Sequence, residues 1–163
     1  MGAASAVAGQ NLGAGKPERS GEAVTVASRI GLGIATIVGI AFLTIPTQLL
    51  GVFGVARPEV VRIGVQLLAY LSVSGLFITT ALTYTGGLQG TGDTKSPLYI
   101  SIISQVIIPI GICLAIKEFG TLEPIHIWFA ILAGHMTRCG LSVMRFLQGK
   151  WRAIAVDIET TQG

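Results

Sequence analysis

Apolar residues fill three long stretches of the chain, and no Asp, Glu, Lys or Arg interrupts them. These stretches are bounded by Arg29 and Arg57, by Arg62 and Asp93, and by Lys95 and Lys117. A helix needs about 20 apolar residues to cross a bilayer core of about 30 Å, and each stretch is that long or longer. A fourth stretch, residues 125–147, is also apolar, and Arg138 is the one charge well inside it.

The pattern therefore predicts four complete transmembrane helices, at about 30–50, 62–86, 96–117 and 125–147. Only helices fit, because backbone groups in lipid must be satisfied within their own segment. Pro58 and Pro124 suit the first position of a helix, whereas Pro46 and Pro109 fall inside spans and should kink or loosen them. Residues 2–13 are too short to span and lack the basic start of a signal peptide. We expect them to be a helix stub, the last turns of a helix that begins earlier.

The composition agrees with a membrane protein. Charged residues make up 12% of the chain, about half of the share in a soluble domain, which argues against a soluble globular domain. The net charge of +3 does not suggest a nucleic-acid partner. Cys113 and Cys139 lie in apolar stretches, which indicates buried thiols and neither a disulfide framework nor a metal site. The predicted fold class is an all-α integral membrane protein in a lipid bilayer.

The charges outside the spans predict an orientation. One side of the membrane would hold seven basic residues: Lys16, Arg19, Arg29, Lys95, Arg145, Lys150 and Arg152. The other side would hold only Arg57, Arg62 and Lys117. Basic connections stay cytoplasmic, so we expect a multi-pass protein of the cell membrane with a cytoplasmic C-terminal tail, residues 153–163. Trp128 and Trp151 lie near the two ends of the last span, as interfacial anchors do.

Two glycine-rich segments, residues 9–20 and 86–97, look at first like phosphate loops. A phosphate loop needs G-x-x-x-x-G-K-[ST] between a strand and a helix. In the first segment Gln10 stands where the first glycine is required, and Pro17 replaces the Ser or Thr. Tight turns between helices explain both segments better. Gly13 and Gly15 would end one helix, and Pro17 would start the next, with Glu18 in its first turn. Gly90 and Gly92 would end a later helix, and Asp93 or Thr94 would cap the one after it, ahead of Pro97.

Three segments resemble the carboxy-terminal half of a multidrug and toxic compound extrusion (MATE) transporter: "AASAVAGQNLGAGKPERS", "GGLQGTGDTKSPLYIS" and "RFLQGKW". The resemblance extends to about Arg152, so residues 1–152 are expected to form part of a MATE-like C-terminal lobe. It implies a fragment with the end of the eighth helix and the ninth to twelfth, and a missing N-terminal lobe as partner. The residues that match the family's loops are Gln10, Gly13, Gly15, Gln89, Gly90, Gly92, Asp93 and Pro97, and their expected role is turn geometry and packing.

The resemblance implies a secondary active antiporter that exports organic, often cationic, compounds and is coupled to sodium ions or protons. It implies no cofactor besides the coupling ion, no metal site and no enzyme activity, so no catalytic residues are assigned. Two alternatives stay open, namely a flippase for lipid-linked sugars in the same superfamily and a small, non-transporting bundle of membrane helices.

Coupling usually needs a carboxylate inside the membrane, which binds a cation or a proton and biases one conformation over the other. None of the four predicted spans contains Asp or Glu. Any coupling acid must therefore lie elsewhere, and we expect that the chain alone does not carry out coupled transport.

The remaining polar residues of the spans are candidates for the transport path. They are Gln66, Thr79, Thr80, Thr83, Tyr84, Gln105 and Arg138. The threonines have an alternative role, because their hydroxyls often bond back to carbonyls of their own helix. Arg138 costs at least about 3 kcal/mol in mid-membrane. It shares one helical stripe with His135, Ser142 and Arg145. It could bond to helix-end carbonyls or to Asp93, or act in gating or in repelling substrate.

Overall fold

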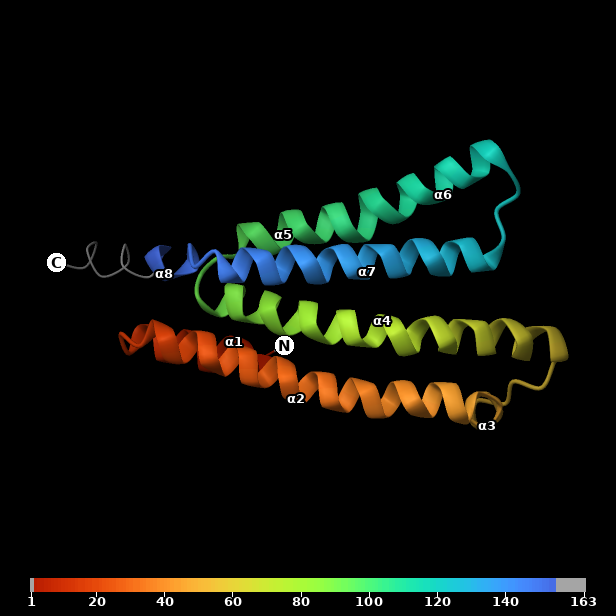
Figure 1. Cartoon of the computed structure of the whole chain (residues 1–163), viewed down its shortest axis with the longest axis horizontal. Coiled ribbons are helices and arrows are strands. Elements are labelled where there is room, and N and C mark those ends of the chain that lie inside the picture. The colour runs from red at the N-terminus through yellow and green to blue at the C-terminus, as the bar shows by residue number, and fades with distance from the viewer. Residues whose placement is uncertain (1, 155–163) are drawn as a thin grey trace.

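The computed structural model describes residues 2–154, and within that range it contains helices and connecting turns but no strand (Figure 1). Four helices are long and apolar enough to cross a membrane: Pro17–Thr44, Pro58–Gly90, Lys95–Phe119 and Pro124–Leu147. The predicted all-α membrane fold class is therefore confirmed. Of the predicted tail, residues 155–163 lie outside the described residues.

The elements follow one another with short connections. They are α1 (Gly2–Gly13), α2 (Pro17–Thr44), α3 (Pro46–Val52), α4 (Pro58–Gly90), α5 (Lys95–Ile102), the π-helix η1 (Ile103–Ile107), α6 (Ile108–Phe119), α7 (Pro124–Leu147) and α8 (Trp151–Ile154). The segments α5, η1 and α6 form one continuous spanning helix.

The first span differs from the expected range of about 30–50. Helix α2 already begins at Pro17, with Glu18 in its first turn, and ends at Thr44. Ile45 leaves the helical conformation at φ −129° and ψ 42°, and Pro46 starts the separate helix α3. Proline lacks an N–H and disfavours the helical conformation in the residue before it. Pro46 thus breaks the helix, where a kink was one of the two expected outcomes.

Pro109 deforms the third span without breaking it. The five-residue π-helix η1 ends two residues before it. The ring of a proline clashes with the carbonyl four residues earlier, and a wider turn relieves that clash. Gly134 of α7 packs against this widened turn. A Cβ atom there would overlap the Ser104 carbonyl oxygen and lie 3.1 Å from Pro109 Cγ, so only glycine lets the two helices approach this closely.

The spanning helices lie in a row, in the order α2, α4, α7 and α5–α6 (Figure 1). Helix α1 packs against both α2 and α4. Small residues bring α2 and α4 together: a Cβ atom on Gly39 would lie 3.1 Å from the Ser72 carbonyl oxygen. Helices α6 and α7, in contrast, diverge toward the loop that joins them (Figure 1).

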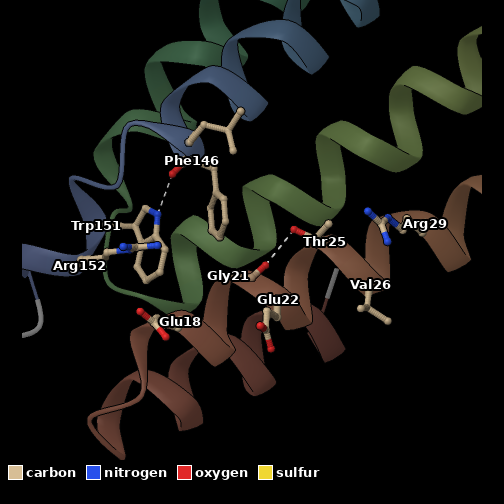
Figure 2. A pocket seen from close by; sticks show the side chains of 10 residues that line it. Glu18, Gly21, Glu22, Thr25, Val26, Arg29, Phe146, Trp151 and Arg152 are labelled. Carbon is tan, nitrogen blue, oxygen red and sulfur yellow. Dashed lines mark hydrogen bonds between the residues drawn. The ribbon is translucent and has the colours of Figure 1, made fainter.

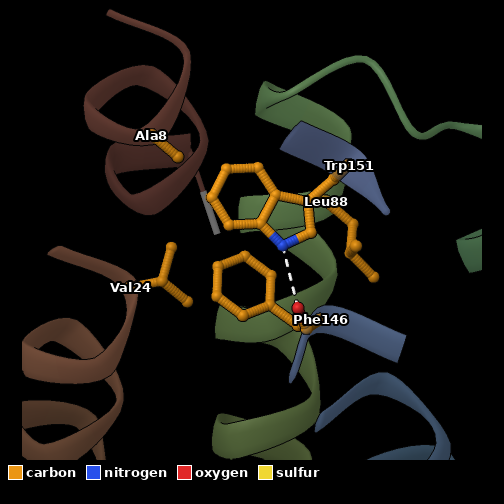
Figure 3. Packing of buried hydrophobic residues seen from close by; sticks show 5 residues of the cluster. All are labelled: Ala8, Val24, Leu88, Phe146 and Trp151. Carbon is orange, nitrogen blue, oxygen red and sulfur yellow. Dashed lines mark hydrogen bonds between the residues drawn. The ribbon is translucent and has the colours of Figure 1, made fainter. Parts of the chain in front are cut away.

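The two ends of this row differ, and we name them here. The base is the end that holds the turns at residues 14–16, 91–94 and 148–150, and the far end holds residues 53–57 and 120–123 (Figure 1). The hydrophobic core lies in the base and consists of Ala8, Val24, Leu88, Phe146 and Trp151 (Figure 3).

Trp151 is a core residue, so its prediction as an interfacial anchor is wrong. Its side chain is 1% exposed, and its ring stacks on Phe146 with 5.0 Å between centroids. The indole N–H donates to the Phe146 carbonyl oxygen at 2.8 Å (Figure 3). The reason is the turn after α7. Gly149 adopts φ +68°, a left-handed conformation that lets the chain fold back over the helix end.

Candidate functional site

All eight residues matched to the family's loops lie in or beside the base. Gly15 and Gly92 take left-handed conformations, at φ +70° and +90°, whereas Gly13 is the last helical residue of α1. Gly90 is where α1 crosses α4, because a Cβ atom on it would overlap the Ser5 carbonyl oxygen. Gln10 and Gln89 are exposed and Pro97 is buried. The glycines thus set turns and a close helix crossing.

Asp93 caps α5 and joins it to α7. It is 5% exposed. Its carboxylate accepts the Ser96 backbone N–H at 3.1 Å and the Ser96 hydroxyl at 2.9 Å. It also accepts a hydrogen bond from Arg145 Nε at 2.9 Å and forms an ion pair with Arg145 Nη2 at 2.8 Å. Thr94, the alternative cap, makes no capping bond with its side chain.

These contacts set the charge of Asp93. Burial alone would raise the pKa of this carboxyl, but the two bonds from Ser96 and the bond and charge of Arg145 outweigh burial. The pKa is therefore below its ordinary value of 3.8, and the group is ionised near neutral pH.

Arg138, which sequence reasoning considered as a partner of Asp93, does not bind it. Arg145 takes that place because it lies two helical turns, about 10 Å, closer to the base. The Nε atom of Arg138 is buried and has no hydrogen-bond partner within residues 2–154.

The other polar residues of this stripe on α7 do find partners. His135 Nδ1 lies 3.4 Å from Gln105 Nε2 of η1, and Ser142 Oγ lies 3.3 Å from Thr85 Oγ1 of α4. Arg138 stands between His135 and Ser142, one turn from each. We call the line formed by His135, Arg138, Ser142 and Arg145 the polar seam of α7. It runs along α7, from about the middle of this helix to the base.

The structure does not gather the threonine candidates around a cavity. The hydroxyls of Thr80 and Thr83 donate to carbonyls of their own helix, those of Leu76 and Thr79, each at 2.9 Å. Thr79 lines an apolar groove of about 370 Å³ between α2 and α4. Tyr84 packs edge-on against Phe146 at the core, with 5.3 Å between ring centroids. None of these side chains forms a hydrogen bond with a residue of the polar seam in the described part of the chain.

Gln66 lies apart from the polar seam. It is half-buried on α4, and nineteen residues, about 28 Å along the helix, separate it from Thr85. Arg138 is only four residues from Ser142, the partner of Thr85. Of the residues predicted for the transport path, the structure therefore brings Gln105 and Arg138 to one seam and leaves Gln66 near the far end.

A cavity of about 560 Å³ lies in the base between α2 and α7–α8 (Figure 2). It combines two acids, two arginines and two aromatic rings: Glu18, Glu22, Arg29, Arg152, Phe146 and Trp151. Sequence reasoning proposed no site here. The four-residue spacing of Glu18 and Glu22, which places both on one helix face, is a signal that could have drawn attention to it. The guanidinium of Arg152 covers the Trp151 ring at 5.3 Å. Charges of both signs leave this cavity without a clear preference for anions or cations.

The chain is similar to known proteins. The model of the MatE family matches residues 1–114. The "Probable multidrug resistance protein NorM" of Thermotoga maritima is 27% identical over 119 residues, which cover 73% of this chain and 25% of the relative. The protein of the same name from Deinococcus radiodurans is 29% identical over 130 residues, covering 74% of this chain and 29% of the relative. The chain thus spans about a quarter of the length of these relatives. No solved structure matches it.

Proposed function

The chain belongs to the MatE family, and from this premise we propose that it forms part of a multidrug efflux transporter of the cell membrane. The strongest support is that the family model matches residues 1–114 and that two relatives are named as multidrug resistance proteins. Four helices able to cross a membrane agree with it. The compounds exported would be organic and often cationic, and a further lobe would complete the transport path.

We propose that the base faces the cytoplasm. Lys16, Lys95, Arg145, Lys150 and Arg152 all lie in or beside its turns. The far end and the helix ends beside it carry Arg57, Arg62 and Lys117. Basic residues are retained on the cytoplasmic side. This orientation would place the turn glycines and the core on the inner side of the membrane.

The energy source would be an inward gradient of sodium ions or protons, and its acid would come from outside these four spans. Every Asp and Glu among residues 2–154 lies near a helix end or in a turn: Glu18, Glu22, Asp93, Glu59, Glu118 and Glu123. Asp93 is already bound by Arg145 and Ser96. We therefore assign these helices the role of a moving lobe and leave ion coupling to the missing lobe.

Ethidium efflux tests the proposed function. Cells of the source organism with the gene intact should retain several-fold less of this fluorescent cation than cells in which the gene is deleted. Equal retention in both strains, over a panel of organic cations and neutral dyes, would overturn the proposal.

The separate inference on ion coupling needs its own measurement. The 163-residue chain alone, reconstituted in sealed vesicles with a sodium or proton gradient, should show no gradient-driven ethidium movement. Gradient-driven movement by the chain alone would contradict the inference on the coupling acid, and it would not affect the efflux proposal.

A further inference from the structure

Arg138 holds a charge deep within the membrane-spanning part of α7. It lies fourteen residues after Pro124 and nine before Leu147, which is about 21 Å and about 14 Å from the two helix ends. The long side chain of an arginine shortens such a distance only in part. Its buried Nε has no hydrogen-bond partner in the described part of the chain.

No acid of the described residues is placed to neutralise this charge. Asp93 is the nearest along the bundle, and its carboxylate is already paired with Arg145 and accepts two hydrogen bonds from Ser96. The remaining acids of residues 2–154 lie near the ends of α2, α4, α6 and α7. A guanidinium without a counter-ion costs at least about 3 kcal/mol at the centre of a membrane.

The groups next to Arg138 are polar side chains that carry hydrogen-bond donors. His135 lies one turn before it and faces Gln105 of η1 at 3.4 Å. Ser142 lies one turn after it and faces Thr85 of α4 at 3.3 Å. Amide, imidazole and hydroxyl groups can each donate to an anion. Gly134 brings η1, and Gln105 with it, close to this stretch of α7.

We propose that Arg138, with Gln105 and His135 beside it, binds a carboxylate within the membrane. The planar fork of a guanidinium matches a carboxylate with two parallel hydrogen bonds, and the pair neutralises both charges. The carboxylate comes either from an acidic side chain of a segment outside the described residues or from a free organic acid. The site goes beyond the efflux proposal and does not depend on it. Arg138 and His135 also lie outside residues 1–114, the part that the family model matches, whereas Gln105 lies within it.

Binding of radiolabelled benzoate tests the free source. The protein is purified from its own membrane with the chains that accompany it and placed in lipid nanodiscs. Wild type should bind benzoate saturably. Arg138→Leu should bind about tenfold more weakly or worse, because a hydrogen bond to a charged group contributes about 1.5–3 kcal/mol. Arg138→Lys should fall between the two, since it keeps the charge and loses the fork. Arg62→Gln, which removes an exposed arginine near the far end, is the matched control and should bind as wild type does.

Carbodiimide coupling tests the fixed source. If wild type binds no benzoate, the Arg138→Lys variant is treated with dicyclohexylcarbodiimide, which joins an amine to a contacting carboxyl group as an amide. Mass spectrometry should then find residue 138 joined to an acidic residue, and untreated variant and treated wild type should show no such product.

Two results would overturn the proposal. One is benzoate binding by Arg138→Leu that equals that of wild type. The other is a wild type that binds no benzoate together with an Arg138→Lys variant that melts like wild type and couples to no acidic residue. Measuring the melting of each variant separates a lost site from a lost fold.

Discussion

The base and the far end of the row of helices are built from the same kinds of residue and packed in different ways. At the base, Phe146 is 5% exposed, stacks on Trp151 and packs edge-on against Tyr84. At the far end, Phe119 is 92% exposed and Phe53 is 83% exposed. Helices α3 and α6 contribute no buried residue, whereas α4 contributes eight, most of them in its half toward the base.

The difference shows that the described residues cover one another's side chains at the base and leave them uncovered at the far end. Turn glycines, the Asp93–Arg145 pair and the fold-back of α8 close the base from within the chain. At the far end, apolar side chains face outward, where lipid tails are as apolar as they are. The base is thus packed from within the described residues, and any further contacts of the far end are made with lipid or with other segments.

Among the substitutions that test this difference between the two ends, truncation of Phe146 should cause the largest loss of stability. Phe146→Ala is expected to lower the free energy of unfolding by about 3–5 kcal/mol, the usual loss for an aromatic residue in a packed core. Both ring contacts, at 5.0 and 5.3 Å, would disappear. The measurement is an SDS titration of the protein in mixed micelles. A loss below about 1 kcal/mol would mean that the base does not pack as a core, and the comparison would fail.

Removing the charge of Asp93 should have a smaller effect. Asp93→Asn should cost about 1.5–3 kcal/mol, because the bonds of Arg145 and Ser96 would lose their charged acceptor. Arg145 is 25% exposed, so water compensates in part. The same SDS titration reads this loss, and Glu59→Gln, an exposed acid near the far end, is the control.

Acid should act on the same carboxylate. The folded-state pKa of Asp93 is below its ordinary value of 3.8, so its contribution to stability is present above that value and is lost as the pH falls through the lower folded-state pKa. Between about pH 5 and pH 3, wild type should therefore lose more stability than Asp93→Asn. Parallel acid titrations of the two proteins would contradict this assignment.

The sequence predicted much of the row of helices. Three charge-free stretches and a fourth with Arg138 well inside it located the four spans, because an unpaired charge in lipid is costly. Pro17, Pro58 and Pro124 stand at the first positions of three of them. The start of α2 at Pro17, with Glu18 in its first turn, is confirmed. The apolar stretch by itself placed the span only at about 30–50, because Glu18, Glu22 and Arg29 precede it. A helix that extends into water keeps its backbone bonds, so polarity alone does not mark its end.

The site was harder to predict, since partners depend on depth and rotation as well as on residue type. Arg138 and Arg145 share one stripe, yet only the position of Arg145 brings it to Asp93. The burial of Trp151 required knowing that Gly149 turns the chain back. The threonines of α4 illustrate the opposite case. The bonds of Thr80 and Thr83 to their own helix are a local preference that sequence reasoning had named as an alternative.

The smallest effect is expected for the same truncation at the far end. Phe119→Ala should change the free energy of unfolding by less than about 0.5 kcal/mol, as for surface substitutions in general. Residue 119 makes little contact with the described residues, so its surroundings change little when its helix separates from the bundle. The SDS titration used for Phe146→Ala compares the two ends directly. It is run on the protein as isolated from its own membrane, with any accompanying chains.

A loss above about 1 kcal/mol would mean that a segment outside residues 2–154 covers Phe119. The contrast between base and far end would then belong to the described residues and not to the assembled protein.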